Sequence, residues 1–359
     1  MNKSQTPVSP AEQLKREIAS MQREVNDLHK KVNLSTIVDR IEDINTKVNA
    51  FSKRVSELRK KNYIFDTTLE KNAFEFVKKW QPTHTNIRIK INQEINSLKG
   101  DIKPIEAQLV KVSSISTNIP IANRTLKTLD VLVKNLSEKV SASERMLRGM
   151  YDSFDRELNL FNKHLTNIEW SVKEFETSNI KLYAQEFLIM GVKCVWTRDG
   201  KKDKDDPEGA LFLTDQRLIF EQRQEIATKK ILFFTKEREL KQEVLVEIPI
   251  GLVESIQTAK QGIFKNQDYL DFTCASGAQY NQAQFHIQNQ NCEDWKALIN
   301  RVQAGDYDKN RTQELDQDVL EKIKNAPSIC PQCGASINVQ IIRGMEQFSC
   351  EFCGAIIKL

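Results

Sequence analysis

Apolar residues recur at alternating steps of three and four through most of the first 180 residues. Two successive series fill residues 11–60, and a third fills residues 126–175. Their members are Leu14, Ile18, Met21, Val25, Leu28 and Val32; Ile37, Ile41, Ile44, Val48, Phe51, Val55 and Leu58; then Leu126, Leu129, Val133, Leu136, Val140, Leu147, Met150, Phe154, Leu158, Phe161, Leu165, Ile168, Val172 and Phe175. A mean spacing of 3.5 is typical of helices that pack along a seam. The pattern predicts a long helical coiled coil or bundle over residues 1–180.

Two kinds of interruption divide this region. The first repeat loses phase at residues 33–36, which predicts either a skip within one helix or a turn in which Ser35 or Thr36 caps a new helix. Residues 62–120 are predicted to form shorter helical pieces, because proline removes a backbone donor and clashes inside a helix. The residues responsible are Pro82, Gly100, Pro104 and Pro120. The pattern leaves open whether the seams meet in an antiparallel bundle or in an oligomeric coiled coil.

The character of the sequence changes near residue 185, where runs typical of strands begin. These runs span residues 186–197, 209–221, 243–249, 268–274 and 278–288. A short amphipathic helix, CEDWKALINRV, follows from Cys292. Strands closed by one helix predict an α+β module over residues 185–305.

Two C-x-x-C pairs lie near the end of the chain. They are Cys330 with Cys333 and Cys350 with Cys353, sixteen residues apart. Four thiolates are the preferred shell of structural zinc, and four cysteines leave no open position for catalysis. The spacing therefore predicts one structural Zn²⁺, in preference to redox pairs or disulfides.

A glycine follows each pair, at Gly334 and Gly354. Glycine accepts the positive φ that turns backbone amides toward the sulfur atoms. Residues 328–359 resemble the C-P-x-C-G zinc ribbons of bacterial and archaeal proteins, which implies two strands around a turn at Arg343 and Gly344. Residues 306–327 are predicted to be a linker that contains a short helix.

The string GALFLTDQRLIF at residues 209–220 predicts a hairpin with a polar turn at residues 214–216. It resembles a hairpin of GRAM and bacterial PH-like domains, and residues 248–256 are similar to another strand of that family. The resemblance implies a seven-stranded, partly open barrel capped by the helix that contains Trp295. It also implies a platform for lipid or protein, although a basic cluster for phosphoinositides is not evident.

Two candidate contact surfaces lie in this module. By strand alternation, Arg217 and Ile219 face away from the barrel interior. Either this face is covered by the helical region or a partner, where Arg217 could pair with a carboxylate, or Arg217 is solvated and Ile219 only favours a strand. The second surface is the segment 229–236, which reads either as an ordinary strand or as a loop that dips into a membrane. Its named members are Lys229, Lys230, Phe233, Phe234 and Lys236.

Charge and motifs narrow the function. The net charge is +4, and residues 1–180 carry 30 basic and 23 acidic side chains, so the basic excess lies outside the ribbon. A near-neutral ribbon argues against nucleic-acid binding, which depends on phosphate neutralisation.

No phosphate-binding loop, dinucleotide motif, metalloprotease motif or nucleophile elbow occurs, and we expect no enzyme. The absence of a signal-peptide pattern predicts a cytoplasmic protein, with peripheral membrane contact left open.

The sequence thus predicts a non-catalytic scaffold or adaptor. Its coiled coil would oligomerise, giving a homo-oligomer, or span a distance, while the PH-like module and the ribbon dock protein partners. The alternatives are a peripheral membrane protein that binds through the PH-like module and, less favoured, a nucleic-acid-associated ribbon protein.

Overall fold

The computed structural model describes residues 9–358, except residues 184, 198–204, 232–233, 263, 265, 316–320, 322–324, 326 and 338–346, and except the side chains of residues 226–238. The chain divides into two compact units. One comprises Met1–Ser52 and Lys71–Asn162, and the other comprises Lys53–Glu70 and Lys163–Leu359. Each unit is described by itself.

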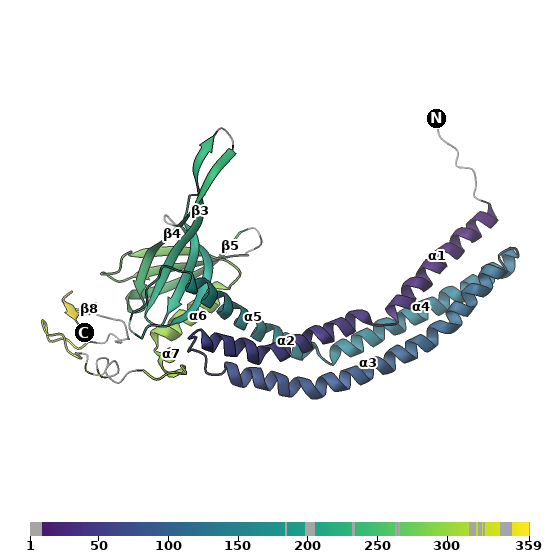
Figure 1. Cartoon of the computed structure of the whole chain (residues 1–359), viewed down its shortest axis with the longest axis horizontal. Coiled ribbons are helices and arrows are strands. Elements are labelled where there is room, and N and C mark those ends of the chain that lie inside the picture. Colours follow the sequence, from purple (N-terminus) through teal and green to yellow (C-terminus); the bar gives the residue numbers. More distant parts are fainter. Residues whose placement is uncertain are drawn as a thin grey trace. The chain divides into compact units, whose positions relative to one another are not determined.

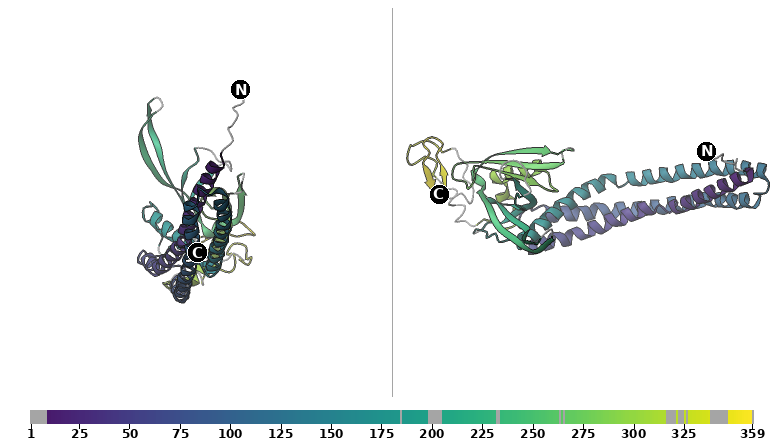
Figure 2. Two further views of the ribbon diagram at one scale, coloured as in Figure 1. Left: turned by 90° about the vertical axis from the view of Figure 1, so that its right-hand side faces the viewer. Right: turned by 90° about the horizontal axis from the view of Figure 1, so that it is seen from above.

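Long helices build the first unit (Figure 1). They are α1 (Pro10–Lys31), α2 (Ser35–Lys60), α3 (Leu69–Ser114), α4 (Ile119–Gly149) and α5 (Asp152–Glu176), of which α2 and α5 each continue into the second unit. Figures 1 and 2 show α3 and α4 running alongside each other. At one end of the unit, Phe51 of α2 meets Phe76 of α3 and Phe161 of α5 edge to face, at centroid distances of 5.6 and 4.9 Å. Aromatic packing of this kind fixes three helices around one core.

Most residues of the predicted seams are buried inside the single chain, whereas Met150 is 39% exposed. Ile37, Ile44 and Val48 are fully shielded from solvent, and the series in α4 is buried as well. Of the two arrangements that the pattern left open, the structure shows the helices packing within one chain. The break at residues 33–36 is a turn, since α1 ends at Lys31 and Leu34 adopts a positive φ of 49°.

The prediction of short helical pieces over residues 62–120 is wrong. Helix α3 runs unbroken for 46 residues with Pro82 and Pro104 inside it. An internal proline costs about 3 kcal/mol of helix stability, but α3 buries a long apolar face that includes Trp80, Ile91 and Leu98. Tertiary burial of that face outweighs the local penalty. Pro120 instead occupies the first turn of α4, where its missing N–H costs nothing.

The second unit contains a seven-stranded antiparallel sheet that is not closed. Its strands are β1 (Leu188–Thr197), β2 (Glu208–Thr214), β3 (Arg217–Ile231), β4 (Phe234–Pro249), β5 (Val253–Gln261), β6 (Gln267–Cys274) and β7 (Gln282–Ile287). The order is β4-β3-β2-β1-β7-β6-β5, so two meanders join through β1 and β7. Helix α6 (Cys292–Gln303) packs on β5 and β6 and buries Trp295 and Ile299, as the amphipathic pattern predicted.

The end of α5 covers the outer face of this sheet. Ser171 Oγ accepts a hydrogen bond from the Gly191 amide at 2.7 Å, and Phe175 packs edge to face on Phe212 at 5.3 Å. Gly191, Phe212 and Ile219 lie opposite one another on β1, β2 and β3. The residues that face outward on these strands are therefore buried under α5.

Chain segments far apart in sequence also meet in this unit. The loop after α2 forms a bridge between Phe65 and Arg311, and the Thr312 amide donates to the Ile64 carbonyl at 2.8 Å. The start of the predicted linker, residues 306–312, therefore packs into this unit through the short helix α7 (Asp306–Lys309). Its Tyr307 is buried against Phe65.

Among the described residues, no helix is long and apolar enough to cross a membrane.

Gly191 supplies a test of the contact between α5 and the sheet. An added Cβ would lie 2.9 Å from Phe212 Cδ1, so Gly191→Ala is expected to destabilise the second unit by about 1–3 kcal/mol. Thermal unfolding of the full chain, followed by circular dichroism, measures the shift. Lys193→Ala, an exposed position on the same strand, is the control and should change stability by no more than about 0.5 kcal/mol. Equal midpoints for the two variants would contradict the close packing.

Candidate metal centre and the buried polar sites of the sheet

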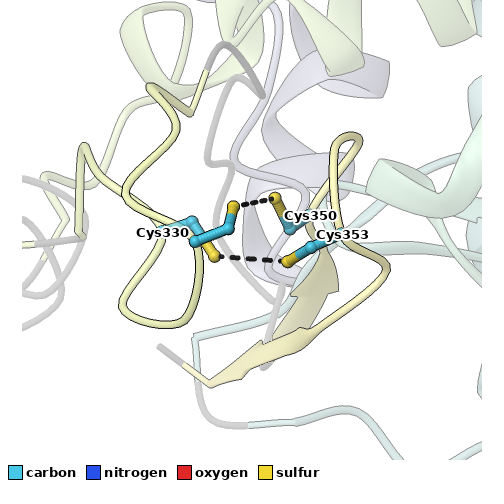
Figure 3. Close-up of side chains that lie close together, drawn as sticks. Cys330, Cys350 and Cys353 are labelled. Carbon is cyan, nitrogen blue, oxygen red and sulfur yellow. Dashed lines mark hydrogen bonds between the residues drawn. The ribbon is translucent and has the colours of Figure 1, made fainter.

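The four predicted cysteines come together at the C-terminal end of the chain. Cys330 and Cys353 Sγ lie 3.7 Å apart, as do Cys333 and Cys350 Sγ. All four sulfur atoms fall within 4.8 Å of one another and turn toward a common centre (Figure 3). A tetrahedron with metal–sulfur bonds of about 2.3 Å has edges of about 3.8 Å. The sulfur positions therefore fit a single four-coordinate metal ion.

Local backbone geometry holds each pair in this position. Gly334 and Gly354 both adopt φ of +72°, as predicted, and their amides donate to the carbonyls of Cys330 and Cys350 at 2.9 Å. The backbone N–H groups of Cys333 and Gln332 donate to the Cys330 sulfur and lower the pKa of that thiol to about 6. The backbone donor at Ala335 acts in the same sense on Cys333, but the neighbouring sulfur atoms outweigh it and raise the pKa of Cys333 to about 12. Donors of this kind stabilise the thiolate that a metal needs.

Among the residues of the ribbon that the structure describes, a small apolar core lies behind the metal centre. Phe348 and Ile357 are buried between strands β8 (Gln347–Ser349) and β9 (Ile356–Lys358), which pair antiparallel. The predicted turn at Arg343 and Gly344 lies outside the described residues. A core this small cannot stabilise the fold by itself, so metal binding would supply much of the folding free energy.

Arg217 is buried and not available to a partner, contrary to the suggested contact role. Its side chain is 5% exposed and binds Glu186 through Nε at 2.8 Å and Nη2 at 2.9 Å, with a further ion pair to Glu247. Nη2 also donates to the Lys181 carbonyl at 2.6 Å, and the guanidinium stacks 3.8 Å from the Tyr183 ring centroid. Burial acts to lower the pKa of Arg217, but the hydrogen bond and charge of Glu186 outweigh burial and raise it. The expected pairing with a carboxylate is present, and it ties the connection between α5 and β1 to the sheet.

The turn between β2 and β3 belongs to the same polar cluster. Thr214 Oγ1 accepts from the amides of Gln216 and Arg217 at 3.1 and 2.9 Å, and it donates to Glu186 at 2.6 Å. The carboxylate of Asp215 accepts from the Phe187 amide at 2.9 Å, which again holds the α5–β1 connection.

Ile219 is fully buried because its neighbours Gly191 and Phe212 lie beneath α5. The sequence allowed either the helical region or a partner to cover this face, and in the structure helix α5 covers it. In the segment 229–236, the backbone continues β3 and β4 as a paired hairpin, with Lys230 opposite Thr235 and Ile231 opposite Phe234. Phe233 and the side chains of Lys229, Lys230, Phe234 and Lys236 lie outside the described residues.

A second buried polar cluster was not anticipated from the sequence. Glu221 is completely buried on β3, where it accepts from the Asn179 amide at 2.6 Å and from Arg223 Nη2 at 2.8 Å. Arg223 in turn binds Glu174 of α5 at 2.8 Å. The available signal was an acidic residue, Glu221, directly after the apolar run Leu218, Ile219 and Phe220.

A cavity of about 260 Å³ opens beside α5 in the second unit. Its walls include Val172, Phe175, Phe187 and Leu188. Leu182 and the ion pair between Lys61 and Glu176, 2.6 Å long, lie at its rim, and these side chains are 37–46% exposed. The cavity is therefore an apolar hollow at the surface with both signs of charge at its edge.

No protein-family model matches this chain, and no curated protein matches it. Solved structures that it resembles include the Vps36 N-terminal PH domain, with 14% identity over 34% of this chain and 82% of that one, at a TM-score of 0.24. The C-terminal domain of an unknown protein from Leishmania infantum shares 17% identity over 33% of this chain and 84% of that one, at a TM-score of 0.20. The DH/PH domains of p115-RhoGEF share 12% identity over 82% of this chain and 94% of that one, at a TM-score of 0.21. PH domains are thus among the neighbours of the sheet, and scores this low carry no argument about function.

Cys330→Ser should abolish metal binding, because three thiolates and a hydroxyl form a poorer shell. We expect about one metal equivalent per wild-type chain by elemental analysis and a clear loss in the variant. Gln332→Ala, an exposed residue of the same knuckle, should retain the metal. A Cys330→Ser protein that keeps a full metal equivalent would contradict the four-cysteine site.

Arg217→Met should destabilise the second unit by about 3–5 kcal/mol, because it leaves the carboxylate of Glu186 buried without its partner. Glu247→Gln is the matched control. Glu247 is 43% exposed, so the loss of its charge should cost no more than about 1 kcal/mol. Urea unfolding of both variants provides the comparison, and similar losses would show that Glu186 does not depend on Arg217.

Proposed function

We propose that this protein is a non-catalytic adaptor whose PH-like module docks a protein partner. The observation that carries the proposal is that the buried arginines of the module are occupied by ion pairs within the chain. Arg217 and Arg223 of β3 are engaged by Glu186, Glu247, Glu221 and Glu174 in holding α5 and its connection to the sheet. The hollow beside α5 is lined mainly by apolar side chains, with Lys61, Asn62, Glu176 and Glu186 also in its lining. An apolar centre with a polar rim is the composition of a protein interface.

The metal centre fits a supporting role in this function. We propose that the ion is Zn²⁺, because four thiolates are its preferred structural shell and because the sulfur spacing matches zinc–thiolate bonds. A four-sulfur shell leaves no position for a water nucleophile. The ribbon would then be a second docking module, with Phe352 in its knuckle 69% exposed.

We propose that the helical unit acts as a spacer within one chain. Its seams are already buried intramolecularly, so the apolar surface that would drive a coiled-coil oligomer is occupied. Helix α3 alone, at about 1.5 Å per residue, is about 70 Å long.

A binding comparison tests the adaptor role. Zinc-loaded full-length protein should retain a specific partner from extract in near-equimolar amount, and the retention should survive Cys330→Ser if the module is the main contact. Vesicles of phosphatidylcholine and phosphatidylserine should not co-sediment the protein. Vesicle binding that falls with salt, without a stoichiometric protein partner, would replace the adaptor role by membrane binding.

A further inference from the structure

The cavity beside α5 has the size and walls of a pocket for a single side chain. Ligand pockets for whole small molecules run to about 300–1,000 Å³, and this one measures about 260 Å³. Its floor is firm, because Val172, Leu188 and Tyr63 are 4–8% exposed. A small pocket with mainly apolar walls suits one large aliphatic or aromatic side chain.

Three separately anchored pieces of chain build the walls. Val172 and Phe175 belong to the part of α5 that Ser171 fixes to Gly191. Phe187 begins the strand-side wall, and its amide is held by Asp215. Leu182 follows Lys181, whose carbonyl accepts from Arg217. The polar clusters of the sheet therefore preorganise the hollow, which lowers the entropic cost of binding.

The rim determines what kind of molecule the pocket suits. Lys61 and Glu176 form an exposed ion pair, and such pairs contribute at most about 1 kcal/mol, so they can exchange partners easily. Leu182 and Tyr183 extend the apolar surface outward, at 37% and 56% exposure. A rim with one charge of each sign is complementary to a zwitterionic or mixed peptide segment. An anionic lipid surface would meet Glu176 as well as Lys61.

We propose that this hollow, defined by Val172, Phe175, Leu182, Phe187 and Leu188, receives a large apolar side chain from an extended or helical peptide segment of a partner protein. The inference rests on the proposed adaptor function and gives that function its anchor. Interfaces concentrate their binding energy in a few apolar anchors that fill pockets, surrounded by a rim that excludes water. The partner segment therefore carries one dominant Leu, Ile, Met or Phe, with charged residues of either sign beside it.

A displayed library of random twelve-residue peptides, selected on zinc-loaded full-length protein, tests the proposal without knowing the partner. Selected peptides should share one large apolar position. Fluorescence anisotropy should show at least a tenfold loss of affinity when that position becomes alanine. Leu182→Lys in the protein should cause a similar loss, and it should leave the fold intact because Leu182 is partly exposed. Val172→Phe, which fills the floor, should also weaken binding.

The matched control is Leu240→Lys, which alters an exposed leucine of β4 in the same unit, 55% exposed. The affinity of this variant for the selected peptides should stay within twofold of the wild-type affinity. The proposal is overturned if no peptide is selected, if the peptides lack an apolar anchor, or if Leu182→Lys binds like the wild type. It is also overturned if phosphatidylcholine vesicles bind the wild type but not Leu182→Lys, since the occupant would then be lipid. A stoichiometric protein partner unaffected by Leu182→Lys would leave the adaptor role standing and remove this pocket from it.

Discussion

The packing of α5 against the outer face of the sheet organises the second unit. Its central contact is the hydrogen bond from the Gly191 amide to Ser171 Oγ, at a position where any Cβ would meet the Phe212 ring. Because the helix lies this close, β1, β2 and the first residues of β3 are mostly buried on both faces. Two of their outward positions accordingly hold the apolar residues Phe212 and Ile219.

Buried ion pairs then fix the connection between α5 and β1, which apolar packing alone would not hold in one position. Glu186 with Arg217, and Glu221 with Arg223, are costly to desolvate and return little net stability. Each pair, however, also binds backbone groups of the connection between α5 and β1, at Lys181 and Asn179. We therefore interpret these pairs as devices that specify one path for this connection. The apolar hollow exists because that path is fixed.

The metal centre depends on different physics from the rest of the chain. Its residues contribute a core of Phe348, Ile357 and two cysteines, whereas the sheet buries most of its strand residues. A bound metal would therefore replace hydrophobic burial as the main source of stability there. The grouping of the four cysteines could be predicted from spacing, since the cysteines, their pair separation and the glycines are all local in sequence.

Local patterns were enough to predict the helices over residues 11–60 and 126–175, the hairpin at residues 209–220, the closing helix and the grouping of the four cysteines. These features depend on the periodicity or spacing of neighbouring residues. Only the tertiary structure determined that α3 runs through Pro82 and Pro104, because the burial that offsets their cost comes from other helices. The burial of Arg217 and Ile219 was also decided by the tertiary structure. Strand alternation predicted the direction in which they point, but it could not predict that α5 covers Ile219 and that Glu186 binds Arg217. The hollow beside α5 also depends on segments more than a hundred residues apart, and no local pattern of residues records it.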